Sequence, residues 1–299
     1  MILVTGATGF IGSHLVTDLA GQGEQVRCLV RDRKKAEKSL PGTNVELVEG
    51  STIHPETLKE ALQGIDTVVH AAFMTADRKE SAENHYNETN VTGTRNLVKA
   101  AQEAGVKRII EIGGLGTKPG KPGSYMQGRY LAEQAVKESK LDWTIIQPSV
   151  LFGKGAPFIK GLSDLIASAP VVPLIGGGKT MFQPILVDDV VRVIEYVLKE
   201  PEQTKGKTYT IGGPEYYSFS EVFDLLLKTM GKSRPKVYAP MPLVGIGAAV
   251  MEAVLPKPPL TRAAMTLFSF DNTTAINSVE RDFGFTPVSF RTHLEAHGI

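Results

Sequence analysis

Three glycines near the start of the chain have the spacing needed to hold a phosphate group. They lie in the stretch Val4-Thr5-Gly6-Ala7-Thr8-Gly9-Phe10-Ile11-Gly12. Gly6 permits a tight turn, Gly9 lets the backbone approach the phosphate, and Gly12 lets a following helix pack close to the preceding strand. A helix that begins at Phe10 would offer its unpaired N–H groups to the anion. The stretch therefore predicts a site for a dinucleotide pyrophosphate.

The end of the next apolar segment, Val26–Val30, bears on the choice between NAD and NADP. An acidic side chain there would bind the adenosine ribose and repel a 2′-phosphate. Arg31 follows the segment instead, and a guanidinium can pair with a 2′-phosphate. Further basic residues come close behind: Arg33, Lys34 and Lys35. NADP(H) is therefore predicted over NAD(H), but the preference inverts if Asp32 points to the ribose, and a solvated charge cluster is the alternative.

Short strands and amphipathic helices alternate in the half of the chain that carries these residues. The strand candidates are Ile2–Thr5, Val26–Val30, Val45–Val48, Thr67–His70, Arg108–Ile112 and Thr144–Ile146. Such alternation predicts an α/β fold, a Rossmann-type doubly wound parallel sheet with helices on both faces. Ligands of such a sheet bind beyond the carboxyl ends of its strands.

The regular alternation ends after Gln147-Pro148, where glycine and proline interrupt short segments. Phe182–Val187 and Thr208–Ile211 are predicted as further strands. We therefore expect a dinucleotide-binding core and a smaller, interleaved C-terminal lobe for the substrate or a partner. The predicted bounds are 1–150 for the core, with 182–212 returning to it, and 151–181 with 213–299 for the smaller lobe.

Composition narrows the classes of partner. The 299 residues are 42% hydrophobic and 22% charged, with a formal net charge of +1. That balance gives no electrostatic reason to expect nucleic acid or an anionic membrane as the main partner, so a small molecule is the better expectation. The single cysteine, Cys28, lies in an apolar segment and is expected to be buried. Six scattered histidines predict no metal site, and the absence of a charged leader predicts a cytoplasmic protein.

The segment Pro242–Leu255 is apolar nearly all round. Such a helix is most often part of a core, but the region 242–268 could instead dock on a protein partner or a membrane surface. Aromatic residues of the same half could line an apolar pocket or pack the lobe. These are Phe152, Phe158, Phe182 and Tyr216-Tyr217.

Several motifs together resemble the extended and atypical short-chain dehydrogenase/reductase superfamily, which includes nucleotide-sugar epimerases. Besides the glycine turn and Tyr125, they are Val69-His70-Ala71-Ala72, Asn90-Val91-Thr92-Gly93-Thr94, Phe182-Gln183-Pro184-Ile185-Leu186-Val187-Asp188-Asp189-Val190 and Gly284-Phe285-Thr286-Pro287. The atypical branch that contains the NADPH-binding accessory subunit of respiratory complex I looks most similar. That likeness rests on Leu29–Asp32, Trp143–Gly153 and Pro258–Thr261.

The resemblance implies further cofactor contacts at strand ends. Ala71 and Ala72 would line the path of the pyrophosphate and the nicotinamide ribose, and Asn90 would steady the fourth strand. Pro148 is assigned to the same cofactor site. Family members commonly have Gly-Asp after the third strand, where the aspartate holds the adenine amino group. This chain has Gly50-Ser51, and the Ser51 hydroxyl can still accept one hydrogen bond.

The resemblance also implies a catalytic set, of which only part is present. Reductases of this superfamily use a tyrosine as proton donor or acceptor, a lysine four residues later and a serine or threonine that orients the substrate. Tyr125 is present, Arg129 stands at the lysine position on the same helical face, and Gly113-Gly114 stand at the serine position. Thr117 or Ser124 could supply the missing hydroxyl if the loop folds inward.

Two other titratable residues lie at strand ends. His70 is interpreted as a hydrogen-bonded residue of the binding pattern and not as a general base. Glu111 could act as a base, but a solvated or ion-paired carboxylate is the expected state.

The sequence thus predicts an NADP(H)-binding protein with an incomplete catalytic set. As an enzyme it would exchange a hydride between NADPH and a carbonyl or quinone-like compound, with Tyr125 as proton donor and Arg129 tuning it. A non-catalytic accessory or sensor protein is the alternative. A nucleotide-sugar epimerase or dehydratase is less favoured, because those enzymes normally retain the serine and lysine and use NAD. Monomer and dimer are both left open.

Overall fold

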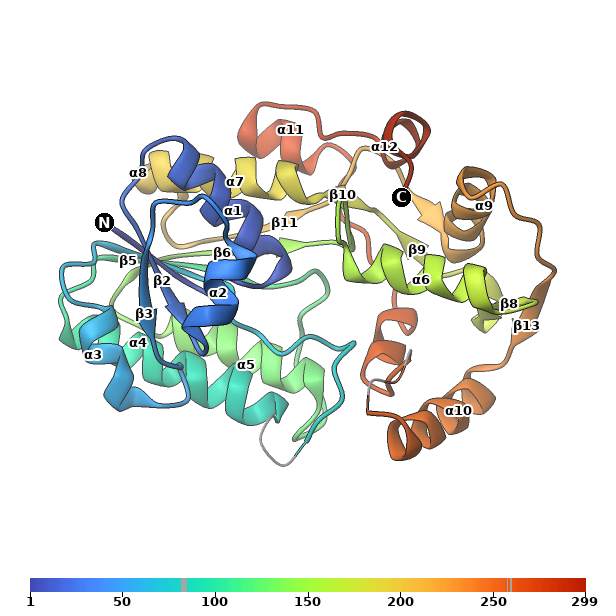
Figure 1. The fold of residues 1–299 in the computed structure, drawn as a ribbon, viewed down its shortest axis with the longest axis horizontal. Helices are drawn as coiled ribbons and strands as arrows, with labels where there is room; N and C mark the ends of the chain where they lie inside the picture. The colour runs from blue at the N-terminus through green and yellow to red at the C-terminus, as the bar shows by residue number, and fades with distance from the viewer. Residues whose placement is uncertain (82–84, 257, 259) are drawn as a thin grey trace. The chain divides into compact units, whose positions relative to one another are not determined.

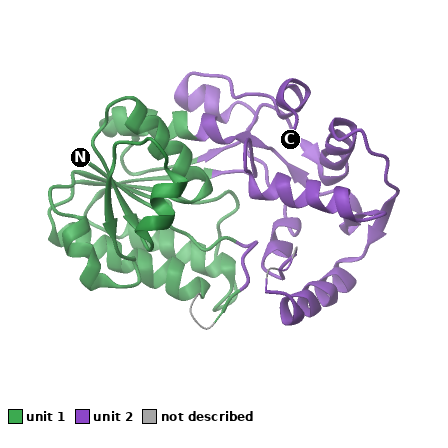
Figure 2. Ribbon diagram, viewed as in Figure 1, with its two compact units in different colours: residues 1–75, 80–147, 191–209 green, residues 76–79, 148–190, 210–299 purple. Residues whose placement is uncertain are grey.

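The computed structural model describes residues 1–81, 85–256, 258 and 260–299. Lys257 and Pro259 of the predicted docking region lie outside the described residues, and Pro259 is also part of the complex I-like motif. The chain divides into two compact units, drawn in green and purple in Figure 2. Unit 1 comprises residues 1–75, 80–147 and 191–209, and unit 2 comprises 76–79, 148–190 and 210–299.

The framework of unit 1 is a seven-stranded sheet (Figure 1). Its strands are β1 (Ile2–Thr5), β2 (Val26–Val30), β3 (Glu46–Glu49), β4 (Thr67–His70), β5 (Arg108–Ile112), β6 (Asp142–Pro148) and β11 (Lys207–Ile211). The strand order is β11-β6-β5-β4-β1-β2-β3. β1 pairs in parallel with β2 on one side and with β4 on the other, so the order of strands reverses at β1. The predicted Rossmann-type fold is confirmed.

Helices cover the two faces of this sheet (Figure 1). They are α1 (Phe10–Gly21), α2 (Arg33–Ser39), α3 (Leu58–Ala61), α4 (Gly93–Glu103), α5 (Tyr125–Lys137), α7 (Val187–Lys199) and α8 (Pro201–Thr204), with short helical turns at η1 (Pro55–Thr57) and η2 (Asn87–Thr92). One buried cluster joins Leu3, Val68 and Ile109 of the strands to Leu97 and Val136 of the helices. Because the strands are apolar on both faces, each face needs such a layer of helices.

Unit 2 is built from short strands of two to four residues, paired two by two. β7 (Leu151–Phe152) pairs in parallel with β10 (Ile185–Leu186), and β8 (Val172–Ile175) pairs in parallel with β13 (Lys236–Ala239). β9 (Met181–Phe182) pairs antiparallel with β12 (Tyr217–Ser218). The helical elements are α6 (Pro157–Ser168), η3 (Gly176–Gly178), α9 (Phe219–Thr229), α10 (Met241–Val254), η4 (Ala264–Phe268), α11 (Ser278–Phe283) and α12 (Phe290–His297).

The single strand predicted at Phe182–Val187 is wrong, because β9 and β10 are two strands separated by Gln183-Pro184. Pro184 has no N–H to donate to a ladder. The Gln183 side chain donates to the Gly213 carbonyl at 2.7 Å and accepts from the Thr274 N–H at 2.7 Å. The side-chain amide thus takes over hydrogen bonds that a continuous strand would make through its backbone.

Aromatic rings fill the interior of unit 2. Phe182 has no exposed surface, and its ring centroid lies 5.6 Å from that of Phe158, 5.9 Å from Phe219 and 5.8 Å from Phe268. Phe152 packs in the same way on Phe290, at 5.0 Å. Of the two interpretations of Phe152, Phe158 and Phe182, packing of the lobe is therefore the one observed.

The expectation that Pro242–Leu255 belongs to a core is wrong for most of the helix that it forms. Ala248 is the buried residue of α10. Leu243, Ile246, Val250 and Val254 are instead among the most exposed large hydrophobic residues of the chain. If α10 belonged to a core, neighbouring residues would cover these four side chains.

Candidate functional site

The glycine turn between β1 and α1 leaves no room for side chains. Gly6 has a φ of +73°, and a β-carbon added to it would lie 2.5 Å from the Ala71 carbonyl oxygen. A β-carbon on Gly12 would overlap the Gly6 carbonyl oxygen. The Gly9 N–H donates to that same oxygen at 2.8 Å. Side chains at these positions would therefore push the turn, the first helix and the end of β4 apart.

The start of α1 is open to an anion. Its N-cap residue is Gly9, which supplies no side-chain hydrogen bond to the first turn. Thr8 is exposed, Phe10 and Ile11 are half-buried, and Ala71 and Ala72 follow β4 directly beside Gly6. The first-turn N–H groups and the positive end of the helix dipole thus remain available for a pyrophosphate. The residues present fit a dinucleotide cofactor.

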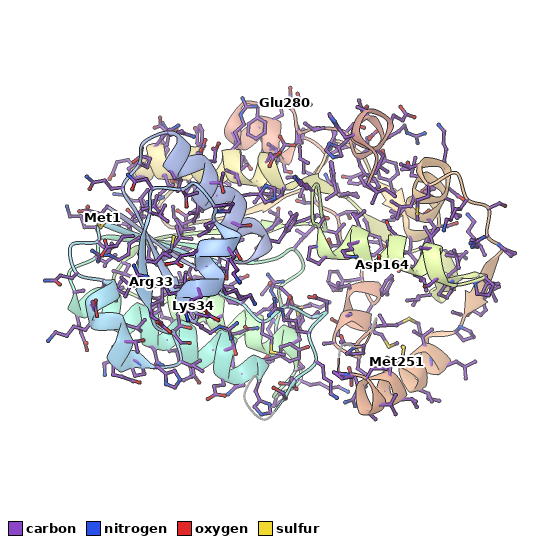
Figure 3. The ribbon with its side chains drawn as sticks, in the orientation of Figure 1. Met1, Arg33, Lys34, Asp164, Met251 and Glu280 are labelled. Carbon is purple, nitrogen blue, oxygen red and sulfur yellow. The ribbon has the colours of Figure 1, made fainter. Side chains whose placement is uncertain are left out.

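The end of β2 separates the roles of Arg31 and Asp32. The Asp32 carboxylate accepts from the Lys35 N–H at 2.9 Å and caps α2. Arg31 is exposed. Arg33 and Lys34 stand in the first turn of α2, as labelled in Figure 3. The carboxylate is therefore occupied by the helix cap, and positive charge surrounds this strand end.

Ser51 and Asn90 are both fixed by hydrogen bonds. The backbone N–H of Ser51 donates to the Thr57 hydroxyl at 3.1 Å, which shapes the turn after β3. Asn90 is fully buried, and its amide bonds to the backbone N–H and carbonyl of Met74 at 2.7 and 3.0 Å. Asn90 thereby holds the segment that follows β4. Pro148, the last residue of β6, is buried.

His70 is a neutral, fully hydrogen-bonded residue. Its Nδ1 lies 2.7 Å from the Thr5 hydroxyl, and its Nε2 lies 2.9 Å from the Thr94 hydroxyl. The Thr94 hydroxyl donates to the Asn90 carbonyl at 2.6 Å, so it accepts from Nε2–H, and Nδ1 accepts from Thr5. Complete burial lowers the pKa of His70 to about 3. A neutral ring with both nitrogens engaged fits the predicted structural role.

Tyr125 and Arg129 meet on one face of α5. The Arg129 guanidinium donates to the Tyr125 hydroxyl at 2.8 Å. The Tyr86 ring packs edge-on against Tyr125, with centroids 5.3 Å apart, and leaves the tyrosine 6% exposed. The phenol is thus held in one orientation by packing on one side and by a charged donor on the other.

Arg129 also occupies the place of a side chain at position 114. A β-carbon added to Gly114 would overlap Nη1, Nη2 and Cζ of Arg129. The Arg129 guanidinium therefore lies against Gly114. The two positions predicted to depart from the catalytic set, 114 and 129, are thus in contact with each other.

Gly113 lies against the buried side chain of Glu133 in a similar way. A β-carbon on Gly113 would lie 2.8 Å from Oε1 of Glu133. Glu133 is 3% exposed, and both of its oxygens accept from the Gln147 amide at 2.9 Å. Glutamate and arginine thus fill the volume next to the two glycines that follow β5.

Glu111 is not the solvated or ion-paired carboxylate that was expected. It is 1% exposed, and its Oε2 has no hydrogen-bond partner among the described residues. Burial, and then the neighbouring Glu133 charge, raise the pKa of Glu111 well above its ordinary value, which Arg129 only partly opposes. Burial thus favours the protonated form of the Glu111 carboxyl.

The two proposed substitutes for serine have other partners. The Thr117 hydroxyl donates to the Gly114 carbonyl at 2.7 Å, and the Ser124 hydroxyl caps α5 by accepting from the Gln127 N–H at 3.3 Å. Both hydroxyls therefore stabilise the loop and the helix that present Tyr125.

Sequence reasoning missed two residues of this site, Glu133 and Tyr86. A signal for Glu133 was available, because Tyr125, Arg129 and Glu133 are spaced four residues apart and share one face of a helix. No comparable signal exists for Tyr86, which reaches Tyr125 from a different segment.

Comparison with known proteins agrees with this geometry. Residues 6–159, just over half of the chain, match a family of proteins described as NAD(P)H-binding. The chain belongs to that family. It is an NAD(P)H-binding member of the atypical short-chain dehydrogenase/reductase and epimerase/dehydratase superfamily, so the predicted resemblance is confirmed.

Three relatives illustrate the spread of this superfamily. An NAD(P)H azoreductase of Xenophilus azovorans is 31% identical over 78% of this chain and 74% of its own. The sterol demethylase protein B of Methylococcus capsulatus is 27% identical over 97% of this chain and 94% of its own. The mitochondrial NADH dehydrogenase 1 alpha subcomplex subunit 9 of Arabidopsis thaliana is 26% identical over 92% and 69%.

A solved structure supports the fold assignment over nearly the whole chain. The dTDP-glucose 4,6-dehydratase of Streptomyces venezuelae, solved with NAD bound, superposes with a TM-score of 0.73. It is 23% identical and covers 99% of this chain and 94% of its own.

Proposed function

We propose that the chain is an NADPH-dependent reductase of a carbonyl group carried by an apolar compound. The observation that carries the proposal is the 2.8 Å hydrogen bond from Arg129 to the Tyr125 hydroxyl, in a chain that belongs to an NAD(P)H-binding family. A phenol held beside a fixed positive charge is suited to donate a proton and to remain briefly as a phenolate.

The proposed step transfers one hydride and one proton. NADPH supplies, when bound, the hydride that adds to the carbonyl carbon. Tyr125 gives its hydroxyl proton to the carbonyl oxygen, which yields an alcohol, and takes a proton back from solvent afterwards. Arg129 stabilises the phenolate and takes over from the missing serine as a donor to the substrate oxygen.

The apolar substrate is proposed by analogy. The name of the Methylococcus capsulatus relative refers to a sterol, and that protein matches nearly its whole length. Candidate probes are therefore a 3-keto steroid and a naphthoquinone, with a nucleotide sugar as the epimerase-type comparison.

A preference for NADPH is part of the proposal. It is supported by the exposed Arg31 at the end of β2 and by the helix cap that engages Asp32. In calorimetric titrations we expect NADPH to bind about tenfold more tightly than NADH. Arg31→Ala should remove that difference and leave NADH binding unchanged. Lys38→Ala, at the far end of the same helix, is the matched control, and equal binding of the two cofactors by the wild type would refute the preference.

Replacement of Tyr125 tests the reaction itself. Tyr125→Phe should reduce NADPH oxidation with the steroid or quinone by about 10²–10⁴-fold and leave the affinity for NADPH unchanged. Tyr130→Phe, five residues later on α5, is the matched control and should keep full turnover. Unchanged turnover in Tyr125→Phe would remove the residue from the mechanism.

A non-catalytic NADPH-binding accessory or sensor protein is the second candidate. It is favoured by the glycines at 113 and 114, which place no hydroxyl beside Tyr125. Tight NADPH binding without turnover of any probe would support this candidate, whereas turnover of the nucleotide sugar would favour an epimerase or dehydratase.

A further inference from the structure

The outer face of α10 consists of uncovered aliphatic side chains. Leu243, Ile246, Val250 and Val254 are 64%, 63%, 56% and 69% exposed. Their spacing of three, four and four residues places them on one face of the helix. Met251, labelled in Figure 3, marks this helix.

The opposite face of α10 is packed. Ala248 has no exposed surface, and a β-carbon added to Gly245 would contact Met265 of η4 at 3.6 Å. Glu252, the helix's one acidic residue, is 13% exposed and accepts from Nε of Arg262 at 2.7 Å. The exposed face therefore carries no charge and no polar side chain.

Positive charge is concentrated in the sequence around this helix. Residues 225–270 contain one acidic residue, Glu252, and six basic residues, although the net charge of the whole chain is only +1. Lys236 pairs with Asp224, and Lys228 with Glu295. Lys232 and Arg234 have no acidic partner within the described residues. The six basic residues are Lys228, Lys232, Arg234, Lys236, Lys257 and Arg262.

We propose that α10 docks on the surface of a lipid bilayer that contains anionic lipids. The four aliphatic side chains would enter the acyl boundary, and Lys232 and Arg234 would meet the headgroups. Tyr238, 64% exposed on the strand just before α10, has the amphipathic ring that suits this boundary. Among the described helices none is long and apolar enough to cross a membrane, so the proposed contact is with the surface alone.

A bilayer matches this face better than a folded partner does. Protein interfaces are rich in aromatic and arginine anchors and form about one hydrogen bond per 100–200 Å². The outer face of α10 offers neither anchors nor hydrogen-bonding side chains. Lipid acyl chains require only apolar contact, and Lys232 and Arg234, which precede β13 and α10 in the chain, would complement anionic headgroups.

Vesicle co-sedimentation with the full chain tests the proposal. We expect binding to phosphatidylcholine vesicles that contain a minor fraction of phosphatidylglycerol, and much weaker binding to phosphatidylcholine alone. Added salt should weaken the binding. Ile246→Ser combined with Val250→Ser should weaken it by about tenfold or more, and Lys232→Gln combined with Arg234→Gln should reduce the preference for the anionic vesicles.

The matched control is Ile276→Ser combined with Val288→Ser. These residues are 49% and 39% exposed, belong to the same unit and lie outside α10, so their replacement should leave vesicle binding unchanged. Failure of the wild type to bind anionic vesicles would overturn the proposal, as would equal binding by the α10 variant. A dimer that dissociates in the α10 variant during analytical ultracentrifugation would assign the face to a second copy and overturn it as well. Vesicle binding needs no turnover, so failure of the proposed reaction would leave this test intact.

Discussion

Unit 1 is organised by one continuous sheet, whereas the strands described in unit 2 pair only two by two. In unit 1 the backbone ladder fixes where each strand ends, and the predicted cofactor residues Arg31, Ser51 and Ala71 follow those ends. In unit 2 aromatic rings that pack at an angle to one another, and side-chain amides such as Gln183, hold the short strands in place. The predicted cofactor site of unit 1 therefore depends on backbone geometry, whereas unit 2 depends on a few large side chains.

We expect the largest loss of stability when a ring is removed from the aromatic interior of unit 2. Phe182→Ala removes a fully buried ring that packs on three others, so we expect the free energy of unfolding to fall by about 3–5 kcal/mol. Urea denaturation measures the change. Tyr216→Ala, at a 42% exposed site of the same unit, is the control and should cost far less. A loss below about 1 kcal/mol would mean that the rings do not carry the stability of unit 2.

A second substitution tests the contact between Gly114 and Arg129 in unit 1. Gly114→Ser places a side chain where the Arg129 guanidinium lies, so it should destabilise the protein by about 1–3 kcal/mol. Arg129→Lys in the same chain should relieve most of that loss, because a lysine side chain can move away from position 114. Thermal unfolding of the two single variants and the double variant gives the coupling energy. Additive effects would show that the two positions do not interlock.

The pH dependence of the free energy of unfolding tests the raised pKa of Glu111. Its folded-state pKa is raised by burial, so the unfolded chain releases the proton at a lower pH than the folded chain does. The wild type should therefore lose stability as pH rises above the ordinary carboxyl range, and Glu111→Gln should not show this loss. In urea unfolding at several pH values, the free energy of unfolding of the variant should rise relative to that of the wild type as the pH increases above about 4. A pH-independent difference between the two proteins would contradict a raised pKa of Glu111.

The smallest effect concerns the exposed helix of unit 2. Ile246→Ser removes a side chain that is 63% exposed, so the free energy of unfolding should change by no more than about 0.5 kcal/mol. Leu226→Ala on α9, a fully buried position in the same unit, should cost about 2–5 kcal/mol. Chemical denaturation of both variants separates the two cases. A large loss for Ile246→Ser would mean that the outer face of α10 is covered.

The strands of unit 1 could be predicted because they are apolar runs bounded by turn residues, and most predicted bounds, such as Arg108–Ile112, agree with the structure. Asn87–Thr92 was harder, because its wide turns continue directly into α4. In unit 2 the prediction failed at Pro184, where one residue divides two strands.

The site was predictable to the level of residue types only. The spacing of Tyr125 and Arg129 follows from the helix period, and the structure brings them together as expected. The contact between Arg129 and Gly114 depends on how β5 and α5 approach each other, which no local pattern encodes. The burial of Glu111 likewise depends on β4 and β6, the two strands that pair with β5.

The fit of Arg129 over Gly114 restricts the order in which these two positions can change during evolution. A serine at 114 would force the Arg129 guanidinium to move, whereas a glycine at 114 leaves it in place. A stepwise route between this pair and a serine–lysine pair avoids that rearrangement if it passes through glycine with lysine. Along that route the hydroxyl is lost before the guanidinium arrives, so the intermediate has neither group beside the tyrosine.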